Sequence, residues 1–273
     1  MLKQRIITAS LLIPLVVWGV LSATIQIIAI ITGVFVAVAA WEWAGLCGWQ
    51  NQKLRIGYAL GFSLMLWLTY LLLSTDIMPF LLLIACLWWI FALGWLGLYQ
   101  YRDFKLPASS TVVKALQGLL ILLPAWSALL LLHQIAGGQS VLFLLILIWI
   151  ADSAAYFVGR QWGKTKLAAK ISPGKTWEGV LGGLLISVSI AWIYVALTTT
   201  MSVLVQIGFV LLCVLTVIAS IVGDLVESLF KRQAGVKDSS QLLPGHGGIL
   251  DRIDSLTAAA PVFVTGVIVG KLF

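Results

Sequence analysis

Carboxylates gather in the last third of a chain that is otherwise poor in charge, since only 10% of its residues are charged. Asp224 lies in IVGDLVESLFKR, and Asp251 and Asp254 lie in LPGHGGILDRIDS. No cysteine or histidine cluster accompanies them, and hard oxygen donors suit a magnesium ion whose other ligands are water and phosphate oxygens. We therefore predict Asp224, Asp251 and Asp254 as ligands of Mg²⁺, with a second metal ion left open.

Basic residues and glycines are interleaved with these carboxylates. If the first stretch is helical, one of its faces carries a polar stripe made of Asp224, Glu227, Ser228, Lys231 and Arg232. Gly245, Gly247 and Gly248 would let backbone N–H groups approach an anion, and the start of the next helix would add its positive end. This pattern predicts a metal-bound polyphosphate. The alternative is a buried ion-pair network that ties two helices together.

Two further segments carry polar groups suited to the same chemistry. ISPGKTWEG is basic and turn-forming, and its Ser172, Lys175 and Thr176 could bind phosphate. It is not a Walker A motif, because Ala169 stands where a glycine is required, and an ordinary basic loop is the alternative. Asp152 lies near the end of an apolar stretch, where an ionisable group is costly unless it lines a polar cavity or meets a partner.

The elements that must position these residues are membrane helices. The chain is 61% hydrophobic and its mean hydropathy is +1.07, far from the composition of soluble domains. Apolar runs long enough to cross a bilayer must be helical, because each has to satisfy its own backbone hydrogen bonds. We expect an all-α integral membrane protein with about nine transmembrane helices, at 6–21, 24–44, 56–73, 78–98, 115–132, 141–157, 179–197, 203–222 and 256–269.

The basic residues predict the orientation of these helices. With a cytoplasmic N-terminus and an external C-terminus, every lysine and arginine except Lys271 falls in an inner segment, as the positive-inside rule requires. Two alternatives concern the N-terminus: 6–44 as one long tilted helix, and a cleaved signal peptide, although no cleavage site leads into a soluble domain. We treat 1–273 as a single polytopic membrane domain, with 1–135 mainly scaffold helices and 136–273 the catalytic half.

The run SLFKRQAGVKDSSQLLPGHGGILDRID, residues 228–254, resembles the signature of the phosphatidate cytidylyltransferase family, the CDP-diacylglycerol synthases. The likeness extends more loosely over the C-terminal half, including Asp152 and the SPGKTWE segment. It implies transfer of a cytidylyl group from CTP to phosphatidate, with release of pyrophosphate. It implies catalytic roles for Asp224, Asp251, Asp254, Lys231, Arg232 and His246. The implied substrate-binding residues are Ser172, Lys175, Thr176, Ser228, Lys237, Asp238, Gly247, Gly248, Arg252 and Asp152.

The expected partners are phosphatidate, CTP and membrane lipid, with a homodimer left open. The net charge of +7 indicates affinity for anionic headgroups, and no nucleic acid is expected because no soluble basic domain exists. We place the protein in a bacterial inner membrane with its site facing the cytoplasm. A related enzyme acting on another lipid phosphate stays an alternative. A transporter is disfavoured, because the polar residues crowd the inner helix ends rather than the midplane.

Overall fold

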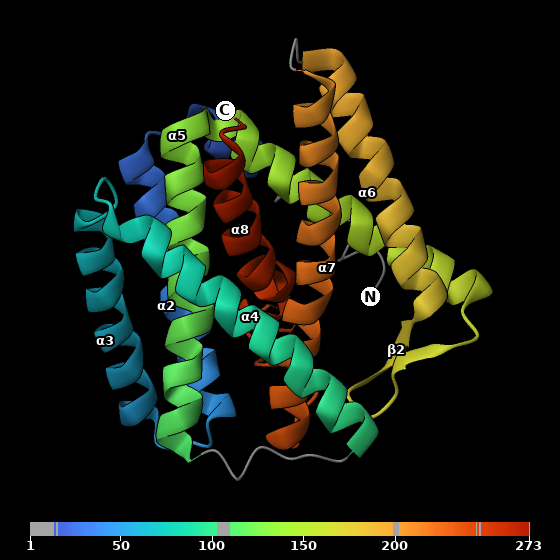
Figure 1. Ribbon diagram of the computed structural model, residues 1–273. Helices are drawn as coiled ribbons and strands as arrows, with labels where there is room; N and C mark the ends of the chain where they lie inside the picture. Colours follow the sequence, from blue (N-terminus) through green and yellow to red (C-terminus); the bar gives the residue numbers. More distant parts are fainter. Residues whose placement is uncertain are drawn as a thin grey trace.

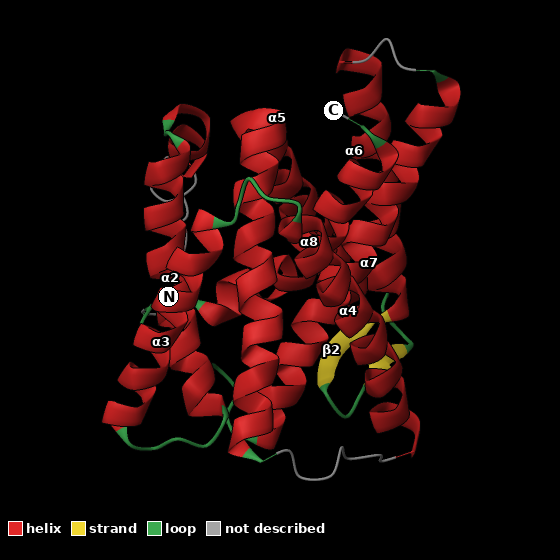
Figure 2. Ribbon diagram, turned by 60° about the vertical axis from the view of Figure 1, so that its left-hand side comes forward, coloured by secondary structure: helices red, strands yellow, loops and turns green. Residues whose placement is uncertain are grey.

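The computed structural model describes residues 14, 16–102, 110–198, 202–243, 245 and 247–272. Within these ranges seven helices are long and apolar enough to cross a membrane. They are α2 (Ile25–Leu46), α3 (Gln52–Leu71), α4 (Ile77–Arg102), α5 (Thr111–Trp162), α6 (Trp177–Thr198), α7 (Val203–Gln233) and α8 (Leu250–Gly270). The expected all-α multi-pass membrane fold is confirmed (Figures 1 and 2).

Helix α5 contains two of the predicted spans. Its 52 residues are interrupted at Gly137, whose backbone is non-helical, with φ 75° and ψ 175°. A positive φ costs glycine little, because it has no Cβ. Figure 1 shows α5 rising through the bundle, turning at the upper end and descending behind α7. The predicted helices 115–132 and 141–157 are therefore the two legs of α5, joined by one glycine rather than by a loop.

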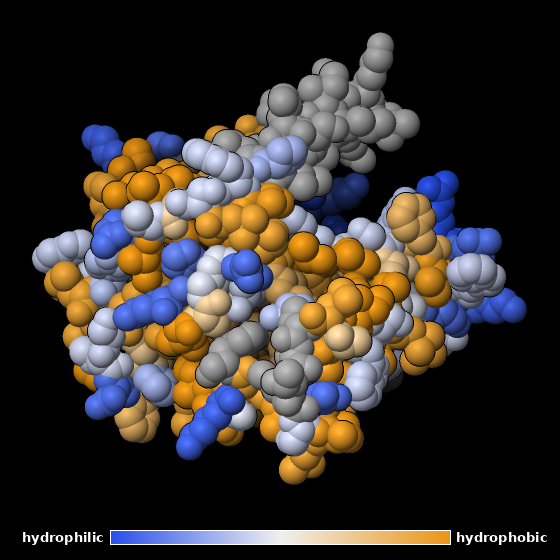
Figure 3. Space-filling view, turned by 90° about the horizontal axis from the view of Figure 1, so that it is seen from above, coloured by the Kyte–Doolittle hydropathy of each residue, from blue (hydrophilic) through white to orange (hydrophobic). Residues whose placement is uncertain are grey.

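The predicted count of nine spans stays a prediction. The first expected span, 6–21, lies mostly outside the described residues, although 16–22 are helical. The orientation of the termini and the division into scaffold and catalytic halves also stay predictions. The space-filling view in Figure 3 shows hydrophobic side chains over much of the surface, as expected of a molecule whose solvent is lipid.

A small hairpin, which the sequence analysis did not predict, joins α5 to α6. Strand β1 (Lys166–Ala168) pairs antiparallel with β2 (Ser172–Thr176). Thr176 ends β2 and is buried, and its Oγ1 accepts a hydrogen bond from Gly179 N at 3.2 Å in the first turn of α6. The hairpin therefore has a fixed exit into α6, and it lies at the same end of the bundle as the lower ends of α4 and α7 (Figure 1).

Helices α7 and α8 pack closely against each other next to the predicted carboxylates. Gly223 of α7 has no room for a Cβ, because the carbonyl oxygen of Asp254 would lie 2.5 Å from it. Helix α2 packs against α7 through aromatic rings, and the ring centroids of Trp43 and Phe230 are 4.6 Å apart. The ends of α2, α7 and α8 are thereby held against one another, and the candidate site lies where they meet.

Candidate active site

One group of predicted residues converges from the second leg of α5, from β2, α7 and α8. Lys175 Nζ lies 2.6 Å from Asp224 Oδ2, and Ser228 Oγ donates to Asp224 Oδ1 at 3.2 Å. Asp152 interacts electrostatically with both Lys175 and Asp224, and Asp254 interacts with Asp224. Segments that lie up to about a hundred positions apart in the sequence therefore supply one cluster of carboxylates around a lysine.

Ser255 connects Asp152 and Asp254 within this cluster. Its backbone N–H donates to Asp254 Oδ1 at 2.7 Å, and its hydroxyl donates to Asp152 Oδ2 at 3.2 Å. Ser255 is itself buried, whereas Asp152 is exposed. The second leg of α5 is thereby held against the start of α8, with the carboxylate of Asp152 at the open side of the cluster.

A second group centres on Lys231 of α7. Its Nζ lies 2.7 Å from Asp251 Oδ1 and 3.3 Å from Glu227 Oε1. Glu227 is buried, and together with Asp254 it lines a small cavity between α7 and α8. The predicted stripe lies on α7 as a connected set of polar side chains: Ser228 bonds to Asp224 and Lys231 pairs with Glu227 on the same helix, and Lys231 also reaches Asp251 of α8. Its last member, Arg232, contacts the hairpin instead.

Asp251 connects Lys231 to the segment that precedes α8. While Oδ1 pairs with Lys231, Oδ2 accepts from Ser239 N and Ser239 Oγ, each at 2.9 Å, and from Gly248 N at 2.7 Å. Both carboxylate oxygens are thus engaged by the chain itself. In this arrangement Asp251 fixes the segment before α8, which is a different role from the predicted open metal ligand.

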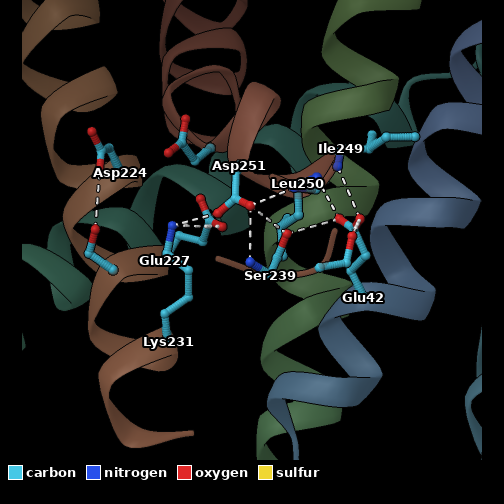
Figure 4. Close-up of polar contacts among 12 residues, drawn as sticks. Glu42, Asp224, Glu227, Lys231, Ser239, Ile249, Leu250 and Asp251 are labelled. Atoms are coloured by element: carbon cyan, nitrogen blue, oxygen red, sulfur yellow. Dashed lines mark hydrogen bonds and ion pairs between the residues drawn. The ribbon is translucent and has the colours of Figure 1, made fainter. Parts of the chain in front are cut away.

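Glu42 enters the same region from α2, in the half expected to be scaffold. It is fully buried, with 0% exposure. Its Oε1 accepts from Ser240 Oγ at 2.5 Å and Ile249 N at 3.0 Å, and its Oε2 accepts from Leu250 N at 2.7 Å and Ser239 Oγ at 3.1 Å. Figure 4 shows Glu42 and Asp251 on opposite sides of Ser239. A carboxylate therefore caps the start of α8 from another helix.

These contacts bear on the expected phosphate cradle, which stays a prediction. The N–H groups of Gly248, Ile249 and Leu250 point to Asp251 and Glu42, so the start of α8 already holds carboxylates where a phosphate was expected. A buried helix start needs acceptors for its first N–H groups, and two carboxylates of the chain supply them.

The glycines of this segment have a packing role. A Cβ on Gly248 would overlap Ser239 Oγ and the Glu42 carboxylate, and Gly247 has φ +82° with Asp251 Oδ2 beside it. Neither position tolerates a side chain without displacing the carboxylate contacts. The glycines predicted to line a phosphate therefore let the backbone close around Glu42 and Asp251.

The other predicted residues lie around these groups. Arg232 Nε donates to the carbonyl oxygen of Ile171 at 3.2 Å, which tethers the hairpin to α7. Thr176 caps α6 and is buried, so its hydroxyl does not face an open site. Ser172 is half-buried on β2. Lys237, Asp238 and Arg252 are exposed. His246 lies outside the described residues.

The donor set suits a hard cation, although the three predicted ligands do not surround one point. Among the described residues, no group of three or more His, Cys, Asp or Glu side chains is arranged to hold a metal ion. The Lys175 ammonium, close to Asp224 and Asp152, shows that a cation is accommodated there. Carboxylate oxygens that hold one cation are chemically suited to Mg²⁺, and which of these carboxylates would bind it stays a prediction.

Sequence reasoning missed Glu42, Ser239 and Ser240. Glu42 is not among the residues that the sequence analysis selects. An ionisable residue near the inner end of an apolar helix marks a functional contact or a buried partner, and that signal was present in the sequence. The two serines lie inside the 228–254 run, but their contacts with Glu42 span almost two hundred positions and follow from no local pattern.

Comparisons with known proteins identify the family to which the chain belongs. The model of the cytidylyltransferase family matches residues 3–269. A protein named phosphatidate cytidylyltransferase from Pseudomonas aeruginosa is 45% identical over 96% of both chains. One of the same name from Haemophilus influenzae is 40% identical over 96% of this chain and 97% of its own length. The chain belongs to the cytidylyltransferase family.

Proposed function

We propose that the protein transfers the cytidylyl group of CTP to phosphatidate, which yields CDP-diacylglycerol and pyrophosphate. A phosphate oxygen of phosphatidate bonds to the α-phosphorus of CTP, and the bond from that phosphorus to the oxygen that bridges to the β-phosphorus breaks. The observation that carries the proposal is the joining of Lys175, Asp224, Asp152 and Asp254 at one end of a membrane bundle. The names of the relatives from Pseudomonas and Haemophilus support the two substrates.

The chain's own residues would act mainly by binding and orientation. Phosphoryl chemistry asks a protein to align two polyanions and to offset their charge. Lys175 and Lys231 lie among the carboxylates, and Lys237 and Arg252 are exposed beside them. We assign the first pair to the transferred phosphate and the exposed pair to the outer phosphates of CTP. A phosphate monoester is already largely ionised near neutral pH, so His246 is assigned to substrate contact rather than to proton abstraction.

A divalent ion is part of the proposal. Asp224 and Asp254, with Asp152 beside them, would hold Mg²⁺, and the ion would neutralise the triphosphate and polarise the phosphorus under attack. In this assignment Asp251 keeps Lys231 and the start of α8 in place. The support is the oxygen-only donor set and the lysine ammonium that the carboxylates already accommodate.

The site is proposed to face the cytoplasm of a bacterial inner membrane. The protein is a multi-pass membrane protein, and the Pseudomonas and Haemophilus relatives are bacterial. CTP is a cytoplasmic nucleotide, and the basic residues of the hairpin and of the segment before α8 lie at the same end of the bundle as the site. Positive inner segments are typical of this orientation.

The direct test uses purified protein in mixed micelles with phosphatidate, CTP labelled at its α-phosphorus, and Mg²⁺. We expect labelled lipid and an equal amount of pyrophosphate. Omission of phosphatidate controls for simple CTP hydrolysis, and diacylglycerol or a polyprenyl phosphate in its place tests the substrate class. Labelled product from another lipid phosphate but not from phosphatidate would contradict the proposed substrate.

A further inference from the structure

A buried glutamate of α2 holds the segment that begins α8. Glu42 is fully buried, and its two carboxylate oxygens accept four hydrogen bonds from Ser239, Ser240, Ile249 and Leu250. All four donors belong to one short segment far away in the sequence. No role in the chemistry proposed above was given to this side chain.

The cost of burial indicates that this contact is specific. A carboxylate removed from water loses several kcal/mol of solvation unless donors replace the water. Here the replacement comes from two hydroxyls and from the positive end of α8. Arg55 interacts with Glu42 only electrostatically, because its Nε donates to Trp41 O and its guanidinium lies 3.7 Å above the Trp41 ring. The segment 239–250 therefore supplies the four hydrogen bonds to Glu42.

We propose that Glu42 is a positioning residue for nucleotidyl transfer, an inference that rests on the proposed function. It fixes the N–H groups of Ile249 and Leu250, and so sets the position and rotation of the first turn of α8. Asp254 lies one turn further along the same helix, beside Asp224. Loss of the Glu42 contact would turn or shift that carboxylate relative to Asp224.

Glu42 and Asp251 accept hydrogen bonds from different backbone amides of this segment. Ser239 Oγ lies 3.1 Å from Glu42 and 2.9 Å from Asp251, so its single proton serves one of them at a time. The N–H groups of Ser239 and Gly248 go to Asp251, whereas those of Ile249 and Leu250 go to Glu42. The backbone amides thus report on the two carboxylates independently.

The first measurement is amide hydrogen exchange of full-length protein in detergent, comparing wild type with Glu42→Gln. A glutamine keeps the shape but turns an N–H₂ group toward donors, so Ile249 or Leu250 loses its acceptor. We expect their exchange to accelerate by about tenfold or more, the scale of one lost hydrogen bond. The amides of Ser239 and Gly248 should change less. Unchanged exchange at Ile249 and Leu250 would overturn the proposal.

The second measurement is steady-state kinetics of the same protein with phosphatidate and CTP. We expect Glu42→Gln to lower kcat by about tenfold or more, which is more than any decrease in the folded fraction accounts for. Glu42→Asp, which keeps the charge, should recover part of the kcat. Asp76→Asn removes an exposed carboxylate in the same half of the chain and is the matched control, with kinetics and exchange as in wild type.

A double mutant separates positioning from general destabilisation. If Glu42 acts through the segment, the losses in kcat from Glu42→Gln and Ser240→Ala will be less than additive, because both break the same contact. Additive losses, or a loss of kcat fully accounted for by a smaller folded fraction, would contradict the role. If wild type makes no labelled lipid while exchange behaves as expected, the proposed function fails and the anchoring by Glu42 stands.

Discussion

Lys175 Nζ lies 2.6 Å from Asp224 Oδ2, and this ion pair joins the β1–β2 hairpin to the polar face of α7. Both side chains are partly exposed, at 26% and 28%, so the pair stands at the boundary between the packed interior and the open side of the site. A metal ion and a phosphate could each replace one member of the pair as a partner of the other. In the proposed function, this is the place where a bound metal ion would pair with Asp224 and a substrate phosphate would pair with Lys175.

Lys175→Met should lower kcat/KM by about a hundredfold, because it removes a cation placed where charge develops. The measurement is labelled-lipid formation over a range of CTP concentrations. Lys166→Met, on the exposed side of β1, removes an equal charge from the same hairpin and should leave kcat/KM within about twofold. Equal losses in the two variants would mean that Lys175 contributes only to the general surface charge.

Asp251→Asn should abolish CTP-dependent pyrophosphate release and also loosen the start of α8. The change leaves Lys231 with Glu227 alone and takes an acceptor from Ser239 or Gly248. A lost charged hydrogen bond of this kind costs about 1.5–3 kcal/mol, so Tm should fall while the protein still inserts in the membrane. Near-normal turnover would remove Asp251 from the site.

Removal of divalent metal with a chelator should stop product formation, and added Mg²⁺ should restore it. If Asp224 is a ligand, Asp224→Asn will raise the Mg²⁺ concentration needed for half-maximal rate by about tenfold or more. Asp76→Asn, which removes an exposed carboxylate far from the site, provides a comparison variant for charge and should leave that concentration unchanged. Full activity in the presence of excess chelator would contradict the metal assignment.

Gly248→Ala should disturb the site although it adds a single methyl group. Its Cβ would overlap Ser239 Oγ and the Glu42 carboxylate, so the segment must move away from α2. We expect kcat to fall by about tenfold or more and the amides of Ile249 and Leu250 to exchange faster. Gly94→Ala on α4, where a Cβ meets nothing within 4 Å, should behave like wild type. Wild-type kinetics of Gly248→Ala would show that the close packing of Gly248 against Ser239 and Glu42 is not needed for activity.

The sequence predicted what depends on local spacing. The positions of Asp224, Glu227, Ser228 and Lys231 on one helix face follow from the helical period, and the structure shows them in contact along α7. Apolar runs likewise predicted the membrane helices. Short-range periodicity is sufficient where all the partners lie on one element.

Contacts between distant segments could not be predicted in this way. Glu42 and its acceptor role depend on α2 lying beside the start of α8, which no local pattern encodes. The amides of 248–250 were expected to face phosphate because their occupation by two carboxylates of the chain was not foreseen. The single-glycine turn of α5 was missed for a related reason, since the residues on either side of Gly137 continue the helix.

The carboxylate cap on α8 has a further consequence for nucleotide binding. Because Glu42 and Asp251 already order the first turn of α8, an arriving nucleotide does not have to spend binding free energy on freezing that backbone. Preorganisation of this kind leaves the interactions with CTP available for the transition state. In the proposed function, α2 holds the backbone in place, and the groups that bind the triphosphate are side chains.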